Sequence, residues 1–257
     1  MRGLFGKVIL VTGSTHGIGH AMAERLRDEG AQVMIHGRDE TELAAATAPG
    51  EPAIAGDLAD PATAQAVVDA TVSAFGRIDG LVNNAGIYPR GVIGETTAAF
   101  FDHVFAVNAR APLLLAEAAI RAFRRQGSGG AIVNIASINA WCGQPDLTVY
   151  SMSKAALVTM TRNLADALGQ DRIRVNALNV GWTFTPNEDA TQRKHGREPG
   201  WETHVPAIFA PTGRIMQPAE IAAHAAFWLS DDSAPVSGQI YEVEQYPLLG
   251  RNRMVGD

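Results

Sequence analysis

The stretch Thr12-Gly13-Ser14-Thr15-His16-Gly17-Ile18-Gly19 decides the fold of this chain. It lies between Lys7–Thr12, a run typical of a buried strand, and Ile18–Glu29, which predicts an amphipathic helix closed by Gly30. The glycines allow a sharp turn and let the backbone approach a pyrophosphate, which exposed N–H groups and the positive end of the helix dipole would hold. The spacing G-x-x-x-G-x-G therefore predicts a phosphate cradle, although glycines alone also suit a tight strand–helix turn that binds nothing.

Beyond this loop, short apolar runs alternate with longer amphipathic stretches. Further strands are predicted at Gln32–His36, Ala53–Ala55, Gly80–Asn83, Ala131–Ala136, Arg174–Val180 and Gln239–Val243. Further helices are predicted after the Asp39 cap with Glu42 as a capping box, from Asp60-Pro61 to Phe75, and over Thr97–Arg125, Tyr150–Leu168 and Pro218–Leu229. Strands separated by helix-length segments predict one doubly wound, Rossmann-type α/β domain, with a seven-stranded parallel sheet and helices on both faces.

The bulk properties are those of an ordinary globular protein. The chain has 257 residues, a formal net charge of −6 and 46% hydrophobic residues, which suits a single domain over residues 1–257. Mild acidity argues against a nucleic-acid partner, and no apolar run reaches the ~18 residues of a membrane span. The chain runs straight into a strand without a leader, so we expect a cytoplasmic protein with no membrane partner.

Two groups of reactive side chains are set aside at this point. The single cysteine, Cys142, excludes an internal disulfide and has no evident partner base that would make it a nucleophile. No Cys/His cluster has zinc spacing, and we expect no metal at His195 or His204. One long segment, residues 183–213, shows no clear period and is predicted to be a substrate lid.

The end of the second strand bears on cofactor choice. In such folds a carboxylate there binds the adenosine ribose, while a nearby arginine accommodates a 2′-phosphate. Here the expected acidic position is Gly37, and Arg38 follows it. A guanidinium pairs well with phosphate, so we predict that NADP(H) is preferred and NAD(H) is possible. The alternative is that Arg38 covers the adenine face or points into water.

Four polar side chains suggest proton and hydride chemistry. Tyr150 and Lys154 are four residues apart and share one helix face, where the ammonium is expected to lower the pKa of the phenol. Such a tyrosine exchanges a proton with an alcohol or carbonyl oxygen. Ser137 ends the fifth strand and could hold the substrate oxygen, while Asn108 could hold a relaying water. Singly, each also has an ordinary structural explanation.

Taken together, these motifs resemble the short-chain dehydrogenase/reductase family over essentially the whole chain. The glycine loop resembles its cofactor motif, Asp57-Leu58 its adenine contact, and Asn83-Asn84-Ala85-Gly86 its NNAG segment. The resemblance implies that Asn108, Ser137, Tyr150 and Lys154 form a catalytic tetrad, with Tyr150 and Lys154 also contacting the cofactor. It implies hydride transfer between NADP(H) or NAD(H) and a secondary alcohol or ketone, and a homotetramer or homodimer. Gly213-Arg214, Pro218 and Glu220 match a structural motif of the family.

The chain departs from the family pattern in two places. Pro-Gly after the sixth strand is replaced by Val180-Gly181, and Gly181 with Thr183 or Thr185 is expected to contact the cofactor. The usual Asp-Gly-Gly turn is replaced by Glu244-Gln245-Tyr246, which adds bulk near the expected subunit interface. We therefore expect an altered oligomer geometry and a different course for the tail after residue 247.

The substrate is expected between the fifth strand, the Tyr150 helix and the lid segment. We assign Ser137, Tyr150, Trp141, Gln144 and Trp182 to substrate contacts, although any one aromatic residue there could instead pack the lid. A 3-oxoacyl compound, a sugar or polyol, and a cyclic ketone all remain open. The alternatives are a non-catalytic dinucleotide sensor, against which the full tetrad argues, and a sugar-nucleotide epimerase or dehydratase, which resembles longer chains.

Overall fold

The protein is built on one parallel sheet of seven strands. The computed structural model describes residues 1–141 and 144–247, so Cys142 and the tail after Pro247 lie outside the described residues. The strand order is β3-β2-β1-β4-β5-β6-β7, and every pair is parallel, as predicted. The strands are β1 (Val8–Val11), β2 (Gln32–Gly37), β3 (Ala53–Ala55), β4 (Gly80–Asn83), β5 (Gly130–Ser137), β6 (Ile173–Val180) and β7 (Ile240–Val243).

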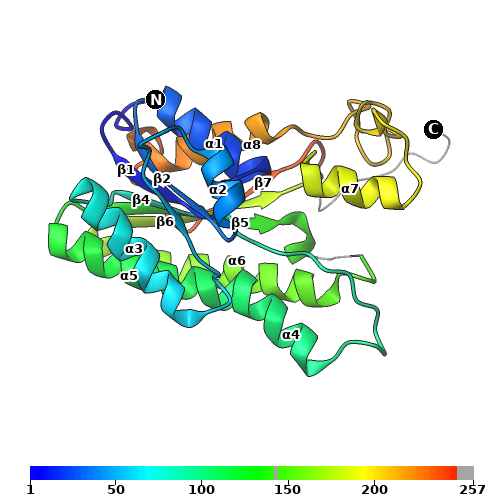
Figure 1. Ribbon diagram of the computed structural model, residues 1–257, viewed down its shortest axis with the longest axis horizontal. Coiled ribbons are helices and arrows are strands. Elements are labelled where there is room, and N and C mark those ends of the chain that lie inside the picture. Colours follow the sequence, from blue (N-terminus) through cyan, green and yellow to red (C-terminus); the bar gives the residue numbers. More distant parts are fainter. Residues whose placement is uncertain (142–143, 248–257) are drawn as a thin grey trace.

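Helices cover both faces of this sheet (Figure 1). One face carries α1 (Gly17–Asp28), α2 (Glu40–Ala46) and α8 (Pro218–Leu229). The other face carries α3 (Pro61–Phe75), α4 (Ala98–Phe105), α5 (Ala111–Gln126) and α6 (Thr148–Leu168). The chain passes between the two layers at the point where the strand order reverses beside β1, as in other doubly wound sheets.

The helix ends follow the predicted signals. Asp60 caps α3 by accepting from the N–H of Ala62, and Gly76 closes that helix in the left-handed conformation with φ 77°. Asp39 caps α2 by accepting from the N–H groups of Thr41 and Glu42. The structure thus contains one of the two interactions of the predicted capping box, the one in which the cap side chain accepts from N–H groups of the first helical turn.

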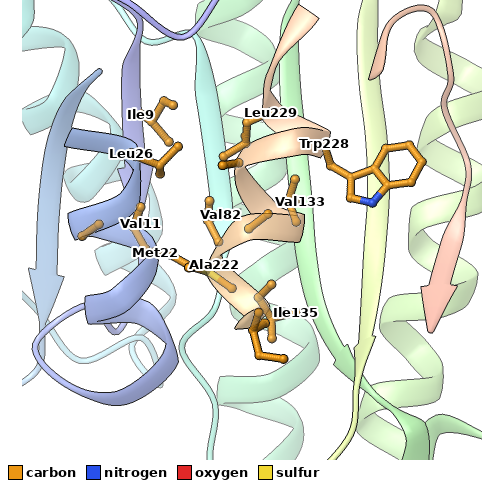
Figure 2. Close-up of a cluster of buried hydrophobic side chains, with 14 of the residues drawn as sticks. Ile9, Val11, Met22, Leu26, Val82, Val133, Ile135, Ala222, Trp228 and Leu229 are labelled. Carbon is orange, nitrogen blue, oxygen red and sulfur yellow. The ribbon is translucent and has the colours of Figure 1, made fainter. Parts of the chain in front are cut away.

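Each face of the sheet has its own hydrophobic core. Figure 2 shows the first, in which Ile9, Val11, Val82, Val133 and Ile135 of the central strands meet side chains of α1 and α8. The helix residues that complete it include Met22, Leu26, Ala222, Trp228 and Leu229. Full burial of one such aliphatic side chain contributes ~1.5–3 kcal/mol. These strands are buried on both faces, which explains why apolar residues dominate them.

The long helical region predicted over Thr97–Arg125 contains an irregularity. Helix α4 leads into a π-helical turn, η1 (Ala106–Arg110), which continues as α5. By length and composition alone Ala98–Gln126 could cross a membrane, which corrects the expectation that no segment reaches that length. Yet 61% of its most apolar window is buried against the rest of the protein, as in the core helix of a soluble protein.

The lid segment has more structure than its sequence suggested. It contains helix α7 (Pro186–Lys194) and the short 3-10 turn η4 (Trp201–Thr203), so its description as an aperiodic loop was wrong. Thr185 caps α7 by accepting from the N–H of Glu188. No residue of α7 is fully buried, so the helix carries no apolar stripe that a periodicity test could detect. In Figure 1, α7 lies beyond the sheet, away from the main helical layers.

Candidate active site

A cavity of about 890 Å³ lies where the strands end. Residues after all seven strands contribute to its wall, which is where doubly wound folds bind ligands. Most residues predicted for the site line it: Gly13, Thr15, Gly17, Ile18, Gly19, Arg38, Asp57, Leu58, Asn84, Ala85, Gly86, Ser137, Gln144, Tyr150, Lys154, Gly181, Trp182 and Thr183. Three predicted residues, Ser14, Asn108 and Trp141, do not belong to the lining.

The glycine loop is shaped by close backbone contacts. Gly13 and Gly17 have φ angles of 61° and 60°, in the region that favours glycine. A Cβ atom on Gly19 would lie 2.2 Å from the carbonyl oxygen of Gly13 and 2.4 Å from the amide nitrogen of Asn84. The Asn84 amide in turn donates to the carbonyl oxygens of Thr12 and Gly13, both at 2.9 Å. The loop is therefore a preformed cradle at the N-terminus of α1.

His36 is a structural residue of the cradle that the sequence did not reveal. Its Nδ1 accepts from the N–H of Gly13 at 3.2 Å, and its Nε2 lies 3.2 Å from the carbonyl oxygen of Gly56, which it serves as a donor. Burial lowers the pKa of His36 to about 4, so the ring is neutral at physiological pH. Ser14 has a similar role, because its hydroxyl donates to the carbonyl oxygen of Val11 inside the turn. Ser14 thus shapes the loop from behind and is not exposed to the cavity.

The second strand ends at the opposite side of the cradle. Arg38 is exposed and lines the cavity. A Cβ atom on Gly37 would lie 2.4 Å from Cγ2 of Thr15, so the position where a ribose-binding carboxylate was expected has no room for a side chain. Asp57 also lines this end, and its carboxylate accepts from the N–H of Ala59 at 2.9 Å. This end of the cavity therefore offers a guanidinium where relatives of this fold can carry an acid.

Tyr150, Lys154 and Ser137 come together at the other end. The ammonium of Lys154 lies 5.8 Å from the centre of the Tyr150 ring, and the Ser137 hydroxyl is near enough to lower the pKa of the phenol. Nζ of Lys154 donates to the carbonyl oxygen of Ile135 at 2.7 Å, and burial lowers its pKa to about 8. The fold therefore brings the phenol, the hydroxyl and the amine to one place in the cavity.

The predicted effect of Lys154 on the phenol is wrong for this structure. Desolvation raises the pKa of Tyr150, the bond to Ser137 opposes that rise, and the charge of Glu188 adds to it. The Lys154 ammonium is held against a backbone carbonyl and lies over the ring, so its charge does not offset the desolvation. Glu188 lies on α7, so a residue of the lid segment acts on the reacting end of the cavity.

Asn108 occupies a buried position behind the cavity. Its side-chain amide donates to the carbonyl oxygen of Ile87 at 2.7 Å and to the hydroxyl of Ser153 at 3.1 Å, and it accepts from the N–H of Ile87 at 2.8 Å. The residue lies in the π-helical turn η1, where helical regularity is locally interrupted. The amide therefore links α4–α5 to the segment after β4 and is not itself on the cavity wall.

The predicted substrate residues separate into two groups. Gln144 and Trp182 line the cavity, and Gln144 accepts from Arg90 at 3.1 Å. The indole N–H of Trp141 instead donates to Glu242 on β7 at 2.9 Å, and its side chain is 42% exposed. Trp141 is thus directed away from the cavity by a partner on a strand distant in sequence.

The atypical C-terminal turn lies at the cavity. Glu244 and Tyr246, which were expected near a subunit interface, line its wall. A Cβ atom on Gly181 would lie 2.0 Å from Oε2 of Glu244, so the turn packs directly on the end of β6. Tyr88 and Glu188 complete this end of the wall. Tyr88 follows residues 83–86, whereas Glu188 lies on α7, a helix that the sequence analysis did not predict.

The cavity fits a nicotinamide dinucleotide. Its size suits a bound organic ligand, the glycine cradle leaves the space that side chains would fill, and Lys154 supplies a buried cation at the far end. Within the described residues no group of three or more His, Cys, Asp or Glu side chains is arranged to hold a metal ion. The fold and this site together define a dinucleotide-binding protein of the Rossmann type.

Comparisons with known proteins place the chain more closely. The family model described as enoyl-(acyl carrier protein) reductase matches residues 13–245. Galactitol 2-dehydrogenase of Agrobacterium fabrum is 35% identical over 250 residues, covering 94% of this chain and 97% of the relative. Levodione reductase of Leifsonia aquatica is 35% identical over 248 residues, covering 93% and 92%. The chain belongs to the short-chain dehydrogenase/reductase family.

Solved structures agree with this assignment. L-sorbose reductase from Gluconobacter frateurii, in complex with NADPH and L-sorbose, matches with a TM-score of 0.90 and 32% identity over 96% of this chain and 98% of that one. A 3-ketoacyl-(acyl-carrier-protein) reductase from Brucella melitensis, in complex with NADH, matches with a TM-score of 0.82 and 31% identity over 94% and 98%. The protein is accordingly an NAD(P)-dependent oxidoreductase of alcohol and carbonyl groups, and the comparisons give the sensor alternative no support.

Proposed function

We propose that this protein is an NADP(H)-preferring dehydrogenase/reductase in which Tyr150 exchanges a proton with the substrate oxygen. The observation that carries the proposal is the convergence of Tyr150, Ser137 and Lys154 at the end of the cavity opposite Arg38. When bound, the nicotinamide cofactor supplies or accepts the hydride. We assign the remaining steps to side chains of this chain.

Tyr150 acts as the proton donor when a carbonyl is reduced. Its raised pKa keeps the phenol protonated at neutral pH, which is the form that a developing alkoxide requires. Ser137 holds the same substrate oxygen, because its hydroxyl lines the same end of the cavity and lies near enough to lower the pKa of the phenol. Lys154, whose ammonium lines the same end of the cavity, would hold the cofactor ribose. Asn108 acts as a positioning residue through the π-helical turn and its bonds to Ile87.

Exchange of Tyr150 for phenylalanine tests the acid/base assignment. Tyr150→Phe should lower kcat by ~10²–10⁴-fold, the usual contribution of a general acid or base, while NADPH binding is retained. Tyr241→Phe, which alters an exposed tyrosine outside this cavity, is the matched control. A panel of carbonyl compounds followed by NADPH absorbance supplies the assay. Normal turnover in Tyr150→Phe would exclude the proposed role, and tight NADPH binding without turnover of any compound would favour the sensor.

The proposed preference for NADP(H) rests on Arg38 and on the lack of space for a carboxylate at Gly37. Charge-assisted bonds from a guanidinium to a 2′-phosphate contribute ~1.5–3 kcal/mol, which corresponds to roughly 10–150-fold in affinity. Arg38→Ala should therefore weaken NADPH binding by about that factor and leave NADH binding nearly unchanged. Arg125→Ala, at an exposed arginine outside the cavity, controls for the loss of surface charge. An unchanged NADPH/NADH affinity ratio in Arg38→Ala would remove the claim.

The remaining parts of the proposal concern the substrate and the assembly. The substrate is a secondary alcohol or ketone of the 3-oxoacyl, sugar/polyol or cyclic ketone type, contacted by Gln144 and Trp182 as well as by Ser137 and Tyr150. Residues 1–257 act as one domain with residues 183–213 as its lid. We further propose a cytoplasmic homotetramer or homodimer, which size-exclusion chromatography with light scattering would test.

A further inference from the structure

A second tyrosine stands beside Tyr150 in the cavity wall. The rings of Tyr88 and Tyr150 meet edge to face, with centroids 6.3 Å apart and an interplanar angle of 68°. The phenol oxygen of Tyr88 is buried and has no hydrogen-bond partner among the described residues. The hydroxyls of Thr185 and Thr191 lie near enough to lower the pKa of Tyr88, but neither forms a hydrogen bond of ordinary geometry with it, and each already bonds to the backbone of α7. Tyr88 therefore holds an O–H donor that the protein itself leaves unused.

Tyr88 also stays protonated under all ordinary conditions. Burial, together with the charge of Glu188, raises its pKa to about 12. A buried hydroxyl without a partner is unfavourable, and such groups in native proteins mark a place where a ligand or water completes the bonding. Since Tyr88 lines the cavity, the missing partner is an acceptor atom of whatever occupies it.

Glu188 provides the complementary group. Its Oε1 accepts from the indole N–H of Trp182 and from the side-chain amide of Gln192, both at 2.8 Å. Across the part of the chain that the structure describes, no donor is hydrogen-bonded to Oε2. The charge of this carboxylate raises the pKa of both Tyr88 and Tyr150, and all three residues line the same cavity. Glu188 is thus a fixed acceptor held at the lid side of the cavity.

We propose that the site selects an uncharged polyhydroxylated substrate, a sugar or sugar alcohol, whose hydroxyl next to the reacting carbon is held jointly by Tyr88 and Glu188. A hydroxyl group both accepts and donates, so one such group accepts from the Tyr88 phenol and donates to the Glu188 carboxylate. An alkyl or acyl chain would leave the buried Tyr88 hydroxyl and Oε2 of Glu188 without partners, and sites of this kind discriminate strongly against such analogues. The inference rests on the proposed function, and it selects one of the substrate classes left open there.

The test compares ketohexoses with ketones of similar size that lack hydroxyl groups. We would measure kcat/KM with NADPH for a panel of ketohexoses, for 2-hexanone and for cyclohexanone, in wild type, Tyr88→Phe and Glu188→Gln. Glu198→Gln, an exposed glutamate of the same lid segment outside the cavity, is the matched control. Tyr88→Phe removes only an unpaired hydroxyl, so its thermal stability should match or exceed that of the wild type.

The expected result is a loss confined to the hydroxylated substrates. Tyr88→Phe should lower kcat/KM for the best ketohexose by roughly 10–100-fold, Glu188→Gln by about tenfold, and Glu198→Gln should change nothing. The ratio of kcat/KM for the best ketohexose to that for 2-hexanone should therefore fall in Tyr88→Phe and Glu188→Gln and stay within about threefold of the wild type in Glu198→Gln, because any effect of Glu188 on the pKa of Tyr150 changes both substrates alike. A wild type that turns over 2-hexanone or cyclohexanone as well as any ketohexose would overturn the inference. Equal losses on both substrate types in Tyr88→Phe and Glu188→Gln would overturn it as well.

A failure of the proposed function gives a different pattern. If no carbonyl compound is turned over, calorimetric titration of sorbitol into the protein saturated with NADP⁺ decides the inference separately. Sorbitol binding that weakens in Tyr88→Phe would support the polyol site in a protein that is not the proposed enzyme. No detectable sorbitol binding in that case would reject the inference together with the function.

Discussion

Replacement of Gly19 by alanine would test whether the glycine cradle is needed for its shape. In the wild type, Gly19 lies in the first turn of α1, buried against the backbone of Gly13 and the side chain of Asn84. A new Cβ atom would lie 2.2 Å from the Gly13 oxygen and 2.4 Å from the Asn84 amide nitrogen. The Gly13 oxygen is backbone and the Asn84 amide is held by two hydrogen bonds, so the loop or the helix must shift.

The size of the effect follows from three contributions. Overpacking of this kind destabilises by ~1–3 kcal/mol. Displacing the Asn84 amide weakens its two bonds to the Thr12 and Gly13 carbonyls, which contribute ~1 kcal/mol each. Alanine regains ~1 kcal/mol of helix propensity relative to glycine. The net expectation is a loss of ~2–4 kcal/mol, or a Tm lower by ~4–16 °C for a chain of this length, with NADPH binding weakened at least about tenfold.

Two measurements and one control decide this prediction. Thermal unfolding gives the stability of Gly19→Ala, and quenching of protein fluorescence by NADPH gives its affinity. Gly169→Ala is the matched control, because nothing lies within 4 Å of the added Cβ atom and its φ of −57° suits alanine. This control should be neutral or slightly stabilising. A Gly19→Ala protein that melts within about one degree of the wild type and binds NADPH normally would refute the reasoning.

Three further changes have defined outcomes. His36 has a pKa of about 4 in the folded protein and ~6.5 in the unfolded chain, so between these pH values only the unfolded state takes up a proton. The free energy of unfolding should therefore fall by up to ~3 kcal/mol as the pH drops from above 6.5 toward 4. His36→Asn should lose this slope in urea denaturation at pH 7 and pH 5, whereas His195→Asn should keep it. Asn108→Ala leaves the N–H and carbonyl of Ile87 unpaired and should cost ~2–3 kcal/mol in the same assay. Lys154→Met removes an ammonium that burial disfavours, since its pKa of about 8 in the folded protein lies below the unfolded value. The free energy of unfolding of the cofactor-free protein should rise by ~1–3 kcal/mol at pH 7, which denaturation midpoints would measure. The variant should also lose turnover, which NADPH oxidation would measure.

The sequence predicted those parts of the fold whose signals are local. Each strand contained a short apolar stretch, and helices such as α3 began at a cap with proline at the first turn and ended at glycine. Helix α7 escaped because it is polar along its whole surface, although its Thr185 cap and Pro186 were visible. Periodicity detects burial, and a helix that packs through a few long polar side chains buries too little to produce it.

Site residues that belong to a local sequence motif were predicted, and those whose position depends on a tertiary contact were missed. The glycine loop and the Tyr150–Lys154 pair reach the cavity because strand ends and one helix face place them there. Trp141 is turned away by Glu242, a partner about a hundred residues later in the chain, and His36 supports the loop through Gly13 and Gly56. No spacing rule connects these pairs, because their separation in sequence reflects the sheet order.

The two departures from the family pattern form one structural unit. Gly181 has no side chain, and only for that reason can the Glu244 carboxylate pack against it, since a Cβ atom there would meet Oε2 at 2.0 Å. The next residue, Trp182, donates its backbone N–H to Glu244 at 3.3 Å and its indole N–H to Glu188 at 2.8 Å. Trp182 therefore orients two carboxylates, that of Glu244 in the C-terminal turn and that of Glu188 in the lid segment. The bulky turn after β7 and the Val-Gly-Trp sequence at the end of β6 together shape the polar side of the cavity. A substitution at either place is therefore expected to alter the position of the other.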